Sequence, residues 1–298
     1  MTKISWIQDF NIFEPHGGAE LSDKAVFKEG VKRGYDMELV NPETANIQNV
    51  ISDDLVIISN ASRYSPDFLS KIVETTEYVI YQHDFVFLCK WRLFYPDLDK
   101  CKNTCPVLPF TRKMMLNSSL NIFLSPLHYN VWKRVLPELK DIPHHLHVST
   151  VDTSVFKPLD TPKVPNSVLC INCLLKFKDL DNIIEYAQKN PDKRITSIGG
   201  IEGGVKLPQN IAYMGGVQNT QLPQIYAQTE AFFHKPNTVE PCGRTTIEAK
   251  LCGVPNLILN NLVGVASYPQ FKYERDKFAK WVQGGPKRFW AKIEKEVL

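Results

Sequence analysis

The sequence has 298 residues, of which 43% are hydrophobic and 22% charged, and this globular composition excludes a disordered, collagen-like or coiled-coil chain. A formal net charge of +3 gives no support to a protein that coats nucleic acid. No apolar run approaches the roughly 20 residues that span a bilayer, and the N-terminus lacks the features of a signal peptide. Seven cysteines, an odd number, favour reduced thiols. We therefore expect a cytoplasmic protein of one large or two medium domains.

The first half of the sequence alternates short apolar runs with helical patterns. Strands are expected at 3–7, 37–40, 55–59, 78–81 and 121–125, and helices from Ala19 to Gly34, at 66–74 and at 127–136. The run at 55–59 (LVIIS) is continuous and β-branched, which is typical of a strand buried on both faces. This alternation predicts a parallel sheet with helices on both faces.

The alternation restarts after the proline-rich segment 157–167 (KPLDTPKVPNS), which we interpret as a linker. Strands are expected at 168–172, 194–198, 211–214, 231–234 and 256–260, and helices at 179–189, 221–228 and 243–252. The last segment, 271–298, is helical and amphipathic in pattern. The sequence therefore predicts an α/β protein with two similar domains, 1–156 and 157–276, and a final helix, 277–298, that packs back on the first.

The stretch 231–260 carries the most specific chemistry. A strand ends near His234, a loop carries Glu240-Pro241-Cys242-Gly243, and a helix starts at about Gly243. The N–H groups at a helix start, together with the helix dipole, form an anion site. Gly243 lets a ligand approach the backbone closely. Arg244 adds a fixed positive charge, and Thr245-Thr246 add hydroxyl donors.

Two carboxylates flank this predicted anion site. Glu240 precedes the helix and can point toward the ligand, whereas Glu248 lies over a turn into the helix and could accept hydrogen bonds from a diol such as a ribose. One carboxylate on each side of a diphosphate suits a nucleotide-sugar. The alternative interpretation is an ordinary helix start with a solvated Glu248.

The same stretch resembles the E-x7-E motif of retaining GT-B glycosyltransferases. Their pattern E-P-F-G-x-x-x-x-E-A-x-x-x-G-x-P has its counterparts here in Glu240-Pro241-Cys242-Gly243, Glu248-Ala249, Gly253 and Pro255. Four further landmarks of the family have counterparts in the same order, namely Gly17-Gly18-Ala19-Glu20, Tyr81-Gln82-His83-Asp84, Val151 to Pro158, and Leu207 to Val217. The resemblance implies a GT-B fold, in which two Rossmann-like domains face each other across a cleft. Domain 1–156 would be the acceptor side and 157–276 the nucleotide-sugar side.

The resemblance also implies a role for each matched residue. Glu240 and His83 would be the catalytic residues and would face the donor sugar from opposite domains. The donor would be held by Gly17, Gly18, Lys178, Cys242, Gly243, Arg244, Thr245, Thr246, Glu248, Gly216 and Val217. The implied reaction transfers a hexose-type sugar from a UDP- or GDP-sugar to a glycan, lipid or other hydroxyl acceptor, with retention of configuration and without metal or other cofactor.

One departure from the family pattern weakens this implication. Cys173 stands where the family has an arginine, and a thiol cannot neutralise a diphosphate as a guanidinium does. Either Arg244 or Lys176 compensates, or donor affinity is weak. Two alternatives therefore stay open: a sugar-nucleotide epimerase of the same fold, and a catalytically weak nucleotide-sugar-binding protein.

Other clusters have two interpretations each. In the loop 85–105, Cys89, Cys101 and Cys105 are either buried thiols or, with a fourth ligand, a zinc site. The histidines of PHHLHV, residues 143–148, precede an expected strand and are either satisfied packing residues or a metal cluster. The basic pairs Lys32-Arg33 and Arg112-Lys113 are either solvated or touch the inner face of a membrane peripherally.

Overall fold

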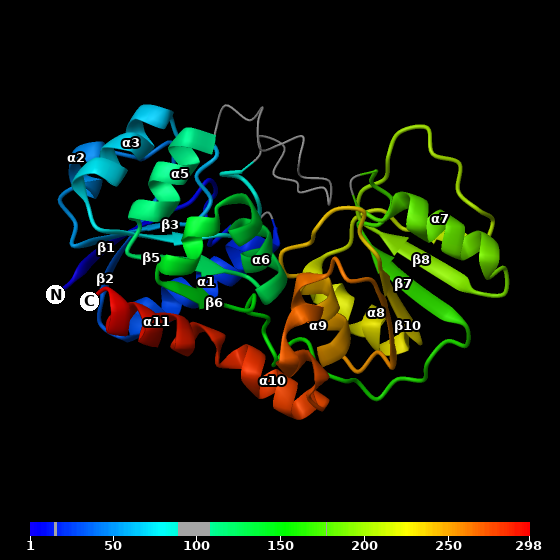
Figure 1. Ribbon diagram of the computed structural model, residues 1–298. Helices are drawn as coiled ribbons and strands as arrows, with labels where there is room; N and C mark the ends of the chain where they lie inside the picture. Colours follow the sequence, from blue (N-terminus) through cyan, green and yellow to red (C-terminus); the bar gives the residue numbers. More distant parts are fainter. Residues whose placement is uncertain (15–16, 89–107, 177) are drawn as a thin grey trace. The chain divides into compact units, whose positions relative to one another are not determined.

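The computed structural model describes residues 1–14, 17–88, 108–176 and 178–298 (Figure 1). The chain divides into two compact units. The first unit contains Met1–Thr150 and Gly284–Leu298, and the second contains Val151–Gln283. The chain enters the second unit at residue 151 and returns to the first unit at residue 284. The sequence placed the first of these boundaries after residue 156.

The first unit is built on a parallel sheet of six strands in the order β2-β1-β3-β4-β5-β6. The strands are β1 Lys3–Ile7, β2 Asp36–Val40, β3 Leu55–Ile58, β4 Tyr78–Tyr81, β5 Leu120–Phe123 and β6 His144–Leu146. The helices are α1 Gly18–Lys32, α2 Ile47–Val50, α3 Pro66–Thr75, α5 Leu108–Asn117, α6 Pro126–Val135 and α11 Gly285–Glu296. Helices α2, α3 and α5 lie on one side of the sheet and α1 and α11 on the other (Figure 1). All residues of β3, β4 and β5 are buried, which confirms the interpretation of continuous apolar runs as strands covered on both faces.

The C-terminal helix α11 packs against α1. Gly30 in α1 makes the close approach possible, because a Cβ there would lie 2.4 Å from Cζ2 of Trp290. Trp290 Nε1 donates a hydrogen bond to the carbonyl of Val26 at 2.8 Å. At the edge of this contact Nη1 of Arg33 donates to both carboxylate oxygens of Glu294, at 2.7 and 2.6 Å. The last helix therefore belongs to the core of the first unit.

The second unit contains a parallel sheet of five strands in the order β11-β10-β7-β8-β9. Its strands are β7 Ser167–Ile171, β8 Arg194–Ile198, β9 Ile211–Tyr213, β10 Ala231–His234 and β11 Asn256–Leu259. Its helices are α7 Leu180–Lys189, α8 Leu222–Gln228, α9 Arg244–Leu251 and α10 Arg275–Gln283. Strand order reverses between β7 and β10, which are hydrogen-bonded neighbours. Such a switch point is where open α/β sheets bind ligands, at the carboxyl ends of the strands.

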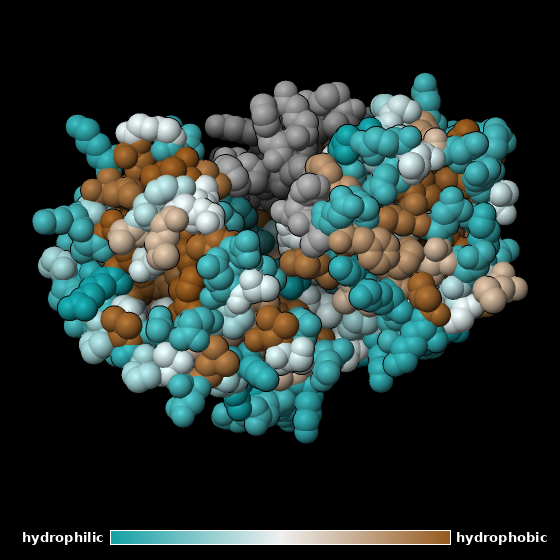
Figure 2. Space-filling view, turned by 180° about the vertical axis from the view of Figure 1, so that it is seen from behind, coloured by the Kyte–Doolittle hydropathy of each residue, from teal (hydrophilic) through white to brown (hydrophobic). Residues whose placement is uncertain are grey.

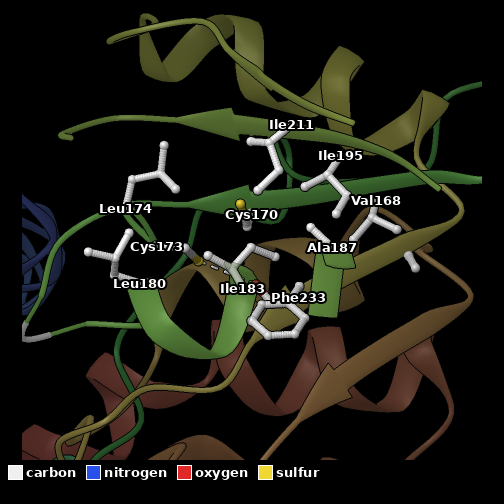
Figure 3. Close-up of a cluster of buried hydrophobic side chains, with 11 residues drawn as sticks. Val168, Cys170, Cys173, Leu174, Leu180, Ile183, Ala187, Ile195, Ile211 and Phe233 are labelled. Atoms are coloured by element: carbon white, nitrogen blue, oxygen red, sulfur yellow. Dashed lines mark hydrogen bonds between the residues drawn. The ribbon is translucent and has the colours of Figure 1, made fainter. Parts of the chain in front are cut away.

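Apolar residues from β7, β8, β10 and α7 form the core of the second unit. Figure 3 shows Ile183 of α7 and Phe233 of β10 close to Cys170 and Cys173. Cys170, Cys173, Cys242 and Cys252 are all buried and fill space as small apolar residues.

Several short elements differ from the sequence predictions. The strand β6 comprises His144–Leu146 itself, whereas the sequence placed a strand after these histidines. Helix α2, with four residues, and α5 were not predicted. In the described part of the chain no helix is both long and apolar enough to cross a membrane. Figure 2 shows hydrophilic residues over much of the visible face, with apolar residues between them in separate patches.

Candidate functional site

The candidate site lies at the switch point of the second sheet. The loop after β7 ends in Lys178 and Asp179, and the loop after β10 runs from Lys235 to Glu240. Backbone contacts tie the two loops together, because Asn237 N donates to the Lys178 carbonyl at 2.8 Å and Lys235 N donates to Asp179 Oδ2 at 2.9 Å. Two charged side chains that are distant in sequence are thereby brought to one edge of the sheet.

Lys178 and Glu240 form an ion pair at this edge. Lys178 Nζ donates to Glu240 Oε2 at 2.6 Å, and the two side chains are 31% and 20% exposed. Burial raises the pKa of Glu240, but Lys178, His234 and the Gly243 N–H outweigh it, so that the pKa lies below its usual value. The carboxylate in turn raises the pKa of Lys178 against the effect of burial. Both groups are therefore charged at neutral pH and reach the surface.

The turn at Gly243 places the start of α9 beside this pair. Gly243 has φ of +82°, and a Cβ there would lie 2.9 Å from Val263 Cγ1, so both the backbone and the packing require glycine. In the first turn of α9 the Thr246 N–H donates to the Gly243 carbonyl at 3.0 Å, and the N–H groups before it have no acceptor four residues earlier in the helix. Thr245 is partly exposed, whereas Cys242 and Thr246 are buried. The hydroxyl of Thr246 is hydrogen-bonded to His234 Nδ1 at 2.8 Å.

Glu248 is buried, so the alternative interpretation of a solvated helix residue is wrong. Its exposed fraction is 2%. Arg244 Nε donates to Glu248 Oε1 at 3.0 Å, and the Tyr226 hydroxyl donates to Oε2 at 3.3 Å. Burial raises the pKa of Glu248 above its usual value despite these two partners. The guanidinium of Arg244 is therefore engaged by a carboxylate of its own helix.

Cys173 points into the protein. Its Sγ donates to Asp179 Oδ2 at 3.2 Å, and burial raises the pKa of the thiol well above its usual value. Asp179 is also buried, and its Oδ1 has no hydrogen-bond partner among the described residues. Burial raises the pKa of this carboxyl although His234, Cys173 and the Lys235 N–H favour the charged form. The position that carries an arginine in the resembled family thus supplies no cation here.

Sequence reasoning did not assign a role to Asp179 or His234. His234 ends β10 and is buried, and burial lowers its pKa although Asp179 and Glu240 oppose this shift. Two features of the sequence could have drawn attention to these residues: His234 lies at the end of an expected strand, and Asp179 directly follows Lys178. Neither feature shows the contacts that bring these residues together.

The remaining predicted site residues lie in other loops. Gly216 and Val217 follow β9, in a loop held by a hydrogen bond from Gly199 N to the Gly215 carbonyl at 2.8 Å. In the first unit, Gly17 caps α1 and Gly18 is its first residue. His83 follows β4, and its Nε2 lies 2.6 Å from Asp23 Oδ1. Asp23 was not singled out by the sequence.

The predicted zinc ligands Cys89, Cys101 and Cys105 lie outside the described residues. Within the ranges that the structure covers, no group of three or more His, Cys, Asp or Glu residues could hold a metal ion. The metal interpretation of the 143–148 histidines is therefore wrong. His145 and His147 are neutral packing residues instead, because burial lowers the pKa of His145 to about 4 and that of His147 well below its usual value.

Three residues of the two basic pairs form ion pairs within the protein. Arg33 binds Glu294 at 2.6 Å, Arg112 binds Glu138 at 2.8 Å and Lys113 binds Glu74 at 2.7 Å.

The complete architecture is similar to solved structures of sugar-transferring enzymes. HepE from Anabaena, in complex with UDP and glucose, superposes with a TM-score of 0.64 over 99% of this chain and 93% of that chain, at 15% identity. Sucrose-phosphate synthase from Thermosynechococcus elongatus gives a TM-score of 0.65 over 99% and 96% of the two chains, at 12% identity. The chain has the GT-B fold. At these identities the likeness establishes the GT-B fold alone.

A third GT-B structure, from E. coli and bound to UDP-2-fluoro glucose, has a TM-score of 0.62, 11% identity and coverage of 99% and 93%. No family profile and no curated protein matches the sequence. The predicted GT-B fold is therefore confirmed at the level of architecture.

Proposed function

We propose that this GT-B protein is a glycosyltransferase that moves a hexose-type sugar from a nucleoside-diphosphate sugar to a hydroxyl group of a glycan or lipid-linked acceptor. The observation that carries the proposal is the Lys178–Glu240 ion pair beside the Gly243 turn, at the carboxyl ends of β7 and β10. Support comes from GT-B neighbours whose structures contain UDP with glucose, UDP-glucose and UDP-2-fluoro glucose. UDP-sugars are therefore the first donors to test, followed by GDP-sugars.

The proposed chemistry is stabilisation of the leaving group. Cleavage of the sugar–phosphate bond builds negative charge on the nucleoside diphosphate, and preorganised cations and dipoles aimed at that charge lower the barrier. Lys178 and the N–H groups at the start of α9 are suited to this role. They require no metal ion. We further propose that the acceptor attacks the face from which the diphosphate departs, so that configuration is retained, and we assign no covalent nucleophile.

Glu240 is proposed to act as an acceptor of hydrogen bonds from the donor sugar. Its carboxylate is ionised and partly exposed, so it binds hydroxyl groups and does not deliver a proton. Glu248 is proposed to bind the ribose as part of its pair with Arg244, and Thr245 to bind phosphate. Thr246 would act through His234, since its hydroxyl is already bonded to that ring.

The deciding experiment is a binding screen of UDP-, GDP- and ADP-sugars, followed by mass analysis of products with glycan and lipid acceptors. Transfer of the sugar mass to an acceptor is the expected result. Conversion of the donor to its epimer would establish the epimerase alternative instead. Binding without turnover would favour the alternative of a nucleotide-sugar-binding protein. The burial of Cys173 agrees with that alternative, because it leaves the arginine position of the resembled family without a cation. The absence of binding by every donor would overturn the proposal.

A further inference from the structure

A buried carboxylate joins the strand ends of the first sheet. Asp23 lies on α1 and is fully buried. Its Oδ1 contacts His83 Nε2 at 2.6 Å. Its Oδ2 accepts hydrogen bonds from Ser59 Oγ at 2.6 Å, from Gln8 Nε2 and from Trp6 Nε1 at 3.4 Å. Gln8 follows β1, Ser59 follows β3 and His83 follows β4, so one side chain connects the ends of three adjacent strands.

The surroundings of Asp23 fix where the protons lie. The Gln8 amide cannot be reversed, because its Oε1 accepts from the N–H groups of Asp9 at 2.9 Å and Asn60 at 3.2 Å. The Gln8 amide nitrogen and the indole of Trp6 can only donate, so Oδ2 of Asp23 is an acceptor. On the other oxygen the partner is His83, and imidazole is a stronger base than a carboxylate. The shared proton therefore resides on Nε2 of His83.

This arrangement leaves Nδ1 of His83 for a ligand. The imidazole ring packs on Tyr81 with a centroid separation of 4.3 Å, which fixes the plane of the ring. Within the described part of the chain the structure gives Nδ1 no hydrogen-bond partner. The side chain of His83 is 5% exposed, so a small part of the ring is open to a ligand at the carboxyl edge of the sheet.

We propose that Asp23 is a positioning residue that holds His83 in the Nε2–H form, so that Nδ1 accepts a hydrogen bond from a hydroxyl group of a bound sugar. The nature of this ligand rests on the proposed function, whereas the protonation pattern rests on the contacts of Asp23 alone. The charge of Asp23 orients His83 much as the aspartate of a catalytic triad orients its histidine.

The test is a long-range ¹H–¹⁵N correlation spectrum of the imidazoles in the ¹⁵N-labelled full-length protein, at a pH where the ring is neutral. His83 is assigned by the signal that disappears in His83→Gln. The wild type is expected to carry its proton on Nε2. In Asp23→Asn the amide oxygen faces the donors Ser59 and Gln8, and the amide NH₂ faces His83. The proton should then move to Nδ1. A wild-type His83 with its proton on Nδ1 would overturn the proposal, even if the variants did not fold.

Ser59→Ala is the matched control. It removes a hydrogen bond to Asp23 Oδ2 but leaves the contact with His83 in place. It should lower stability without changing the tautomer. A tautomer change in Ser59→Ala would show that general loosening, and not the charge of Asp23, decides the protonation pattern.

Activity separates this inference from the proposed function. In Asp23→Asn we expect kcat for sugar transfer to fall at least about tenfold, with a smaller change in KM, because the wrong tautomer presents an N–H donor where the sugar hydroxyl requires an acceptor. Unchanged kcat with a switched tautomer would overturn the role in ligand binding. A wild type that turns over no donor would reject the proposed function, while the spectrum would still decide the role of Asp23.

Discussion

Lys178 is the residue on which the proposed donor site depends most. In Lys178→Ala the Glu240 carboxylate keeps its place but loses its cation, and the site repels a diphosphate. We expect UDP affinity to fall by about tenfold or more, which corresponds to at least about 1.4 kcal/mol. Titration calorimetry with UDP measures this loss. Lys189→Ala is the matched control, because Lys189 pairs with Glu185 on the exposed face of the adjoining helix α7. Equal affinities in all three proteins would show that the phosphate site lies elsewhere.

Cys173 is predicted to matter for stability and not for donor binding. The thiol is buried and bonded to Asp179, so Cys173→Ala removes one hydrogen bond and a little packing. The expected loss is about 1 kcal/mol of unfolding free energy, measured by urea denaturation. UDP affinity should remain within about twofold of the wild type, since a neutral buried thiol contributes little to diphosphate binding. A pronounced fall in affinity without loss of stability would contradict this account.

The residues that could be predicted are those within a continuous motif. Lys178 and Glu240 follow from the strand–loop–helix patterns and the family resemblance, and the structure joins them at 2.6 Å. Asp23, Asp179 and His234 were missed because their importance arises from contacts across the sheet. The Asp23–His83 contact, for example, joins residues 60 positions apart. No local pattern marks such a pair.

At the level of elements, the Gly243 turn sets the start of α9. Gly243→Ala would place a side chain in a left-handed backbone conformation and push its Cβ to 2.9 Å from Val263. The conformation alone costs about 1–2 kcal/mol, and the contact adds to it. We expect a loss of unfolding free energy of roughly 2–4 kcal/mol together with loss of UDP binding.

Gly253→Ala provides the control for this turn. Gly253 has φ of +73°, but its nearest neighbour, Pro158 Cγ, lies 3.6 Å from the added Cβ. This variant should therefore lose only the conformational part and should still bind UDP. Equal losses of stability in the two variants would show that the contact with Val263 contributes nothing.

The packing of α1 against α11 gives a second prediction for an element. Replacing a helix-interior glycine by alanine ordinarily stabilises a helix by about 1 kcal/mol. At Gly30 the added Cβ would lie 2.4 Å from Trp290 Cζ2 and 3.0 Å from Met37 Sδ. We therefore expect Gly30→Ala to destabilise the protein by about 1–3 kcal/mol through overpacking, as measured by thermal or urea unfolding. A stabilised variant would contradict this close helix contact.

Elements were predictable where burial is complete. The strands β1, β4, β8 and β10 begin and end as the sequence predicts, and β3 and β5 differ from their predictions by one or two residues at an end. Edge strand β6 was missed because its three residues, His144–Leu146, are polar at two positions and only partly buried. Helix α2 is one turn long and leaves no periodic pattern. The boundary of an element that packs on one side only is set by tertiary contacts, which local sequence does not record.

At the scale of the whole molecule, the two units of the GT-B fold present different chemical groups at the carboxyl edges of their sheets. The near-neutral net charge of the chain does not show this difference. In the second unit the partly exposed cation Lys178 lies at the carboxyl edge of its sheet, beside Glu240. In the first unit the carboxyl edge of the sheet carries His83, which is proposed to act as an acceptor and whose Nε2 lies 2.6 Å from Asp23 Oδ1. A diphosphate is bound by charge and a hydroxyl by a lone pair. The two edges are therefore suited to different parts of a nucleotide-sugar reaction.

His145, a partly buried histidine of the first unit, should contribute a loss of stability on mild acidification. Arg288 and Lys292 of α11 and the neighbouring His144 add to the effect of burial on the pKa of His145. The unfolded chain takes up a proton near pH 6.5, whereas native His145 does so only near its pKa of about 4. The unfolded state thus binds more protons between these values, and unfolding becomes easier as pH falls through this window.

The variant His145→Gln isolates this contribution from the opposing one. Buried Asp179 and Glu248 have raised pKa values, so they favour the native state as pH falls, and the total pH dependence mixes both signs. The free-energy difference between wild type and His145→Gln removes the carboxyl contributions, which the two proteins share. We expect this difference to shift in favour of the variant by up to roughly 3 kcal/mol between pH 7 and pH 4, measured by urea unfolding at each pH. A difference that does not change with pH would mean that His145 is protonated as readily in the native protein as in the unfolded chain.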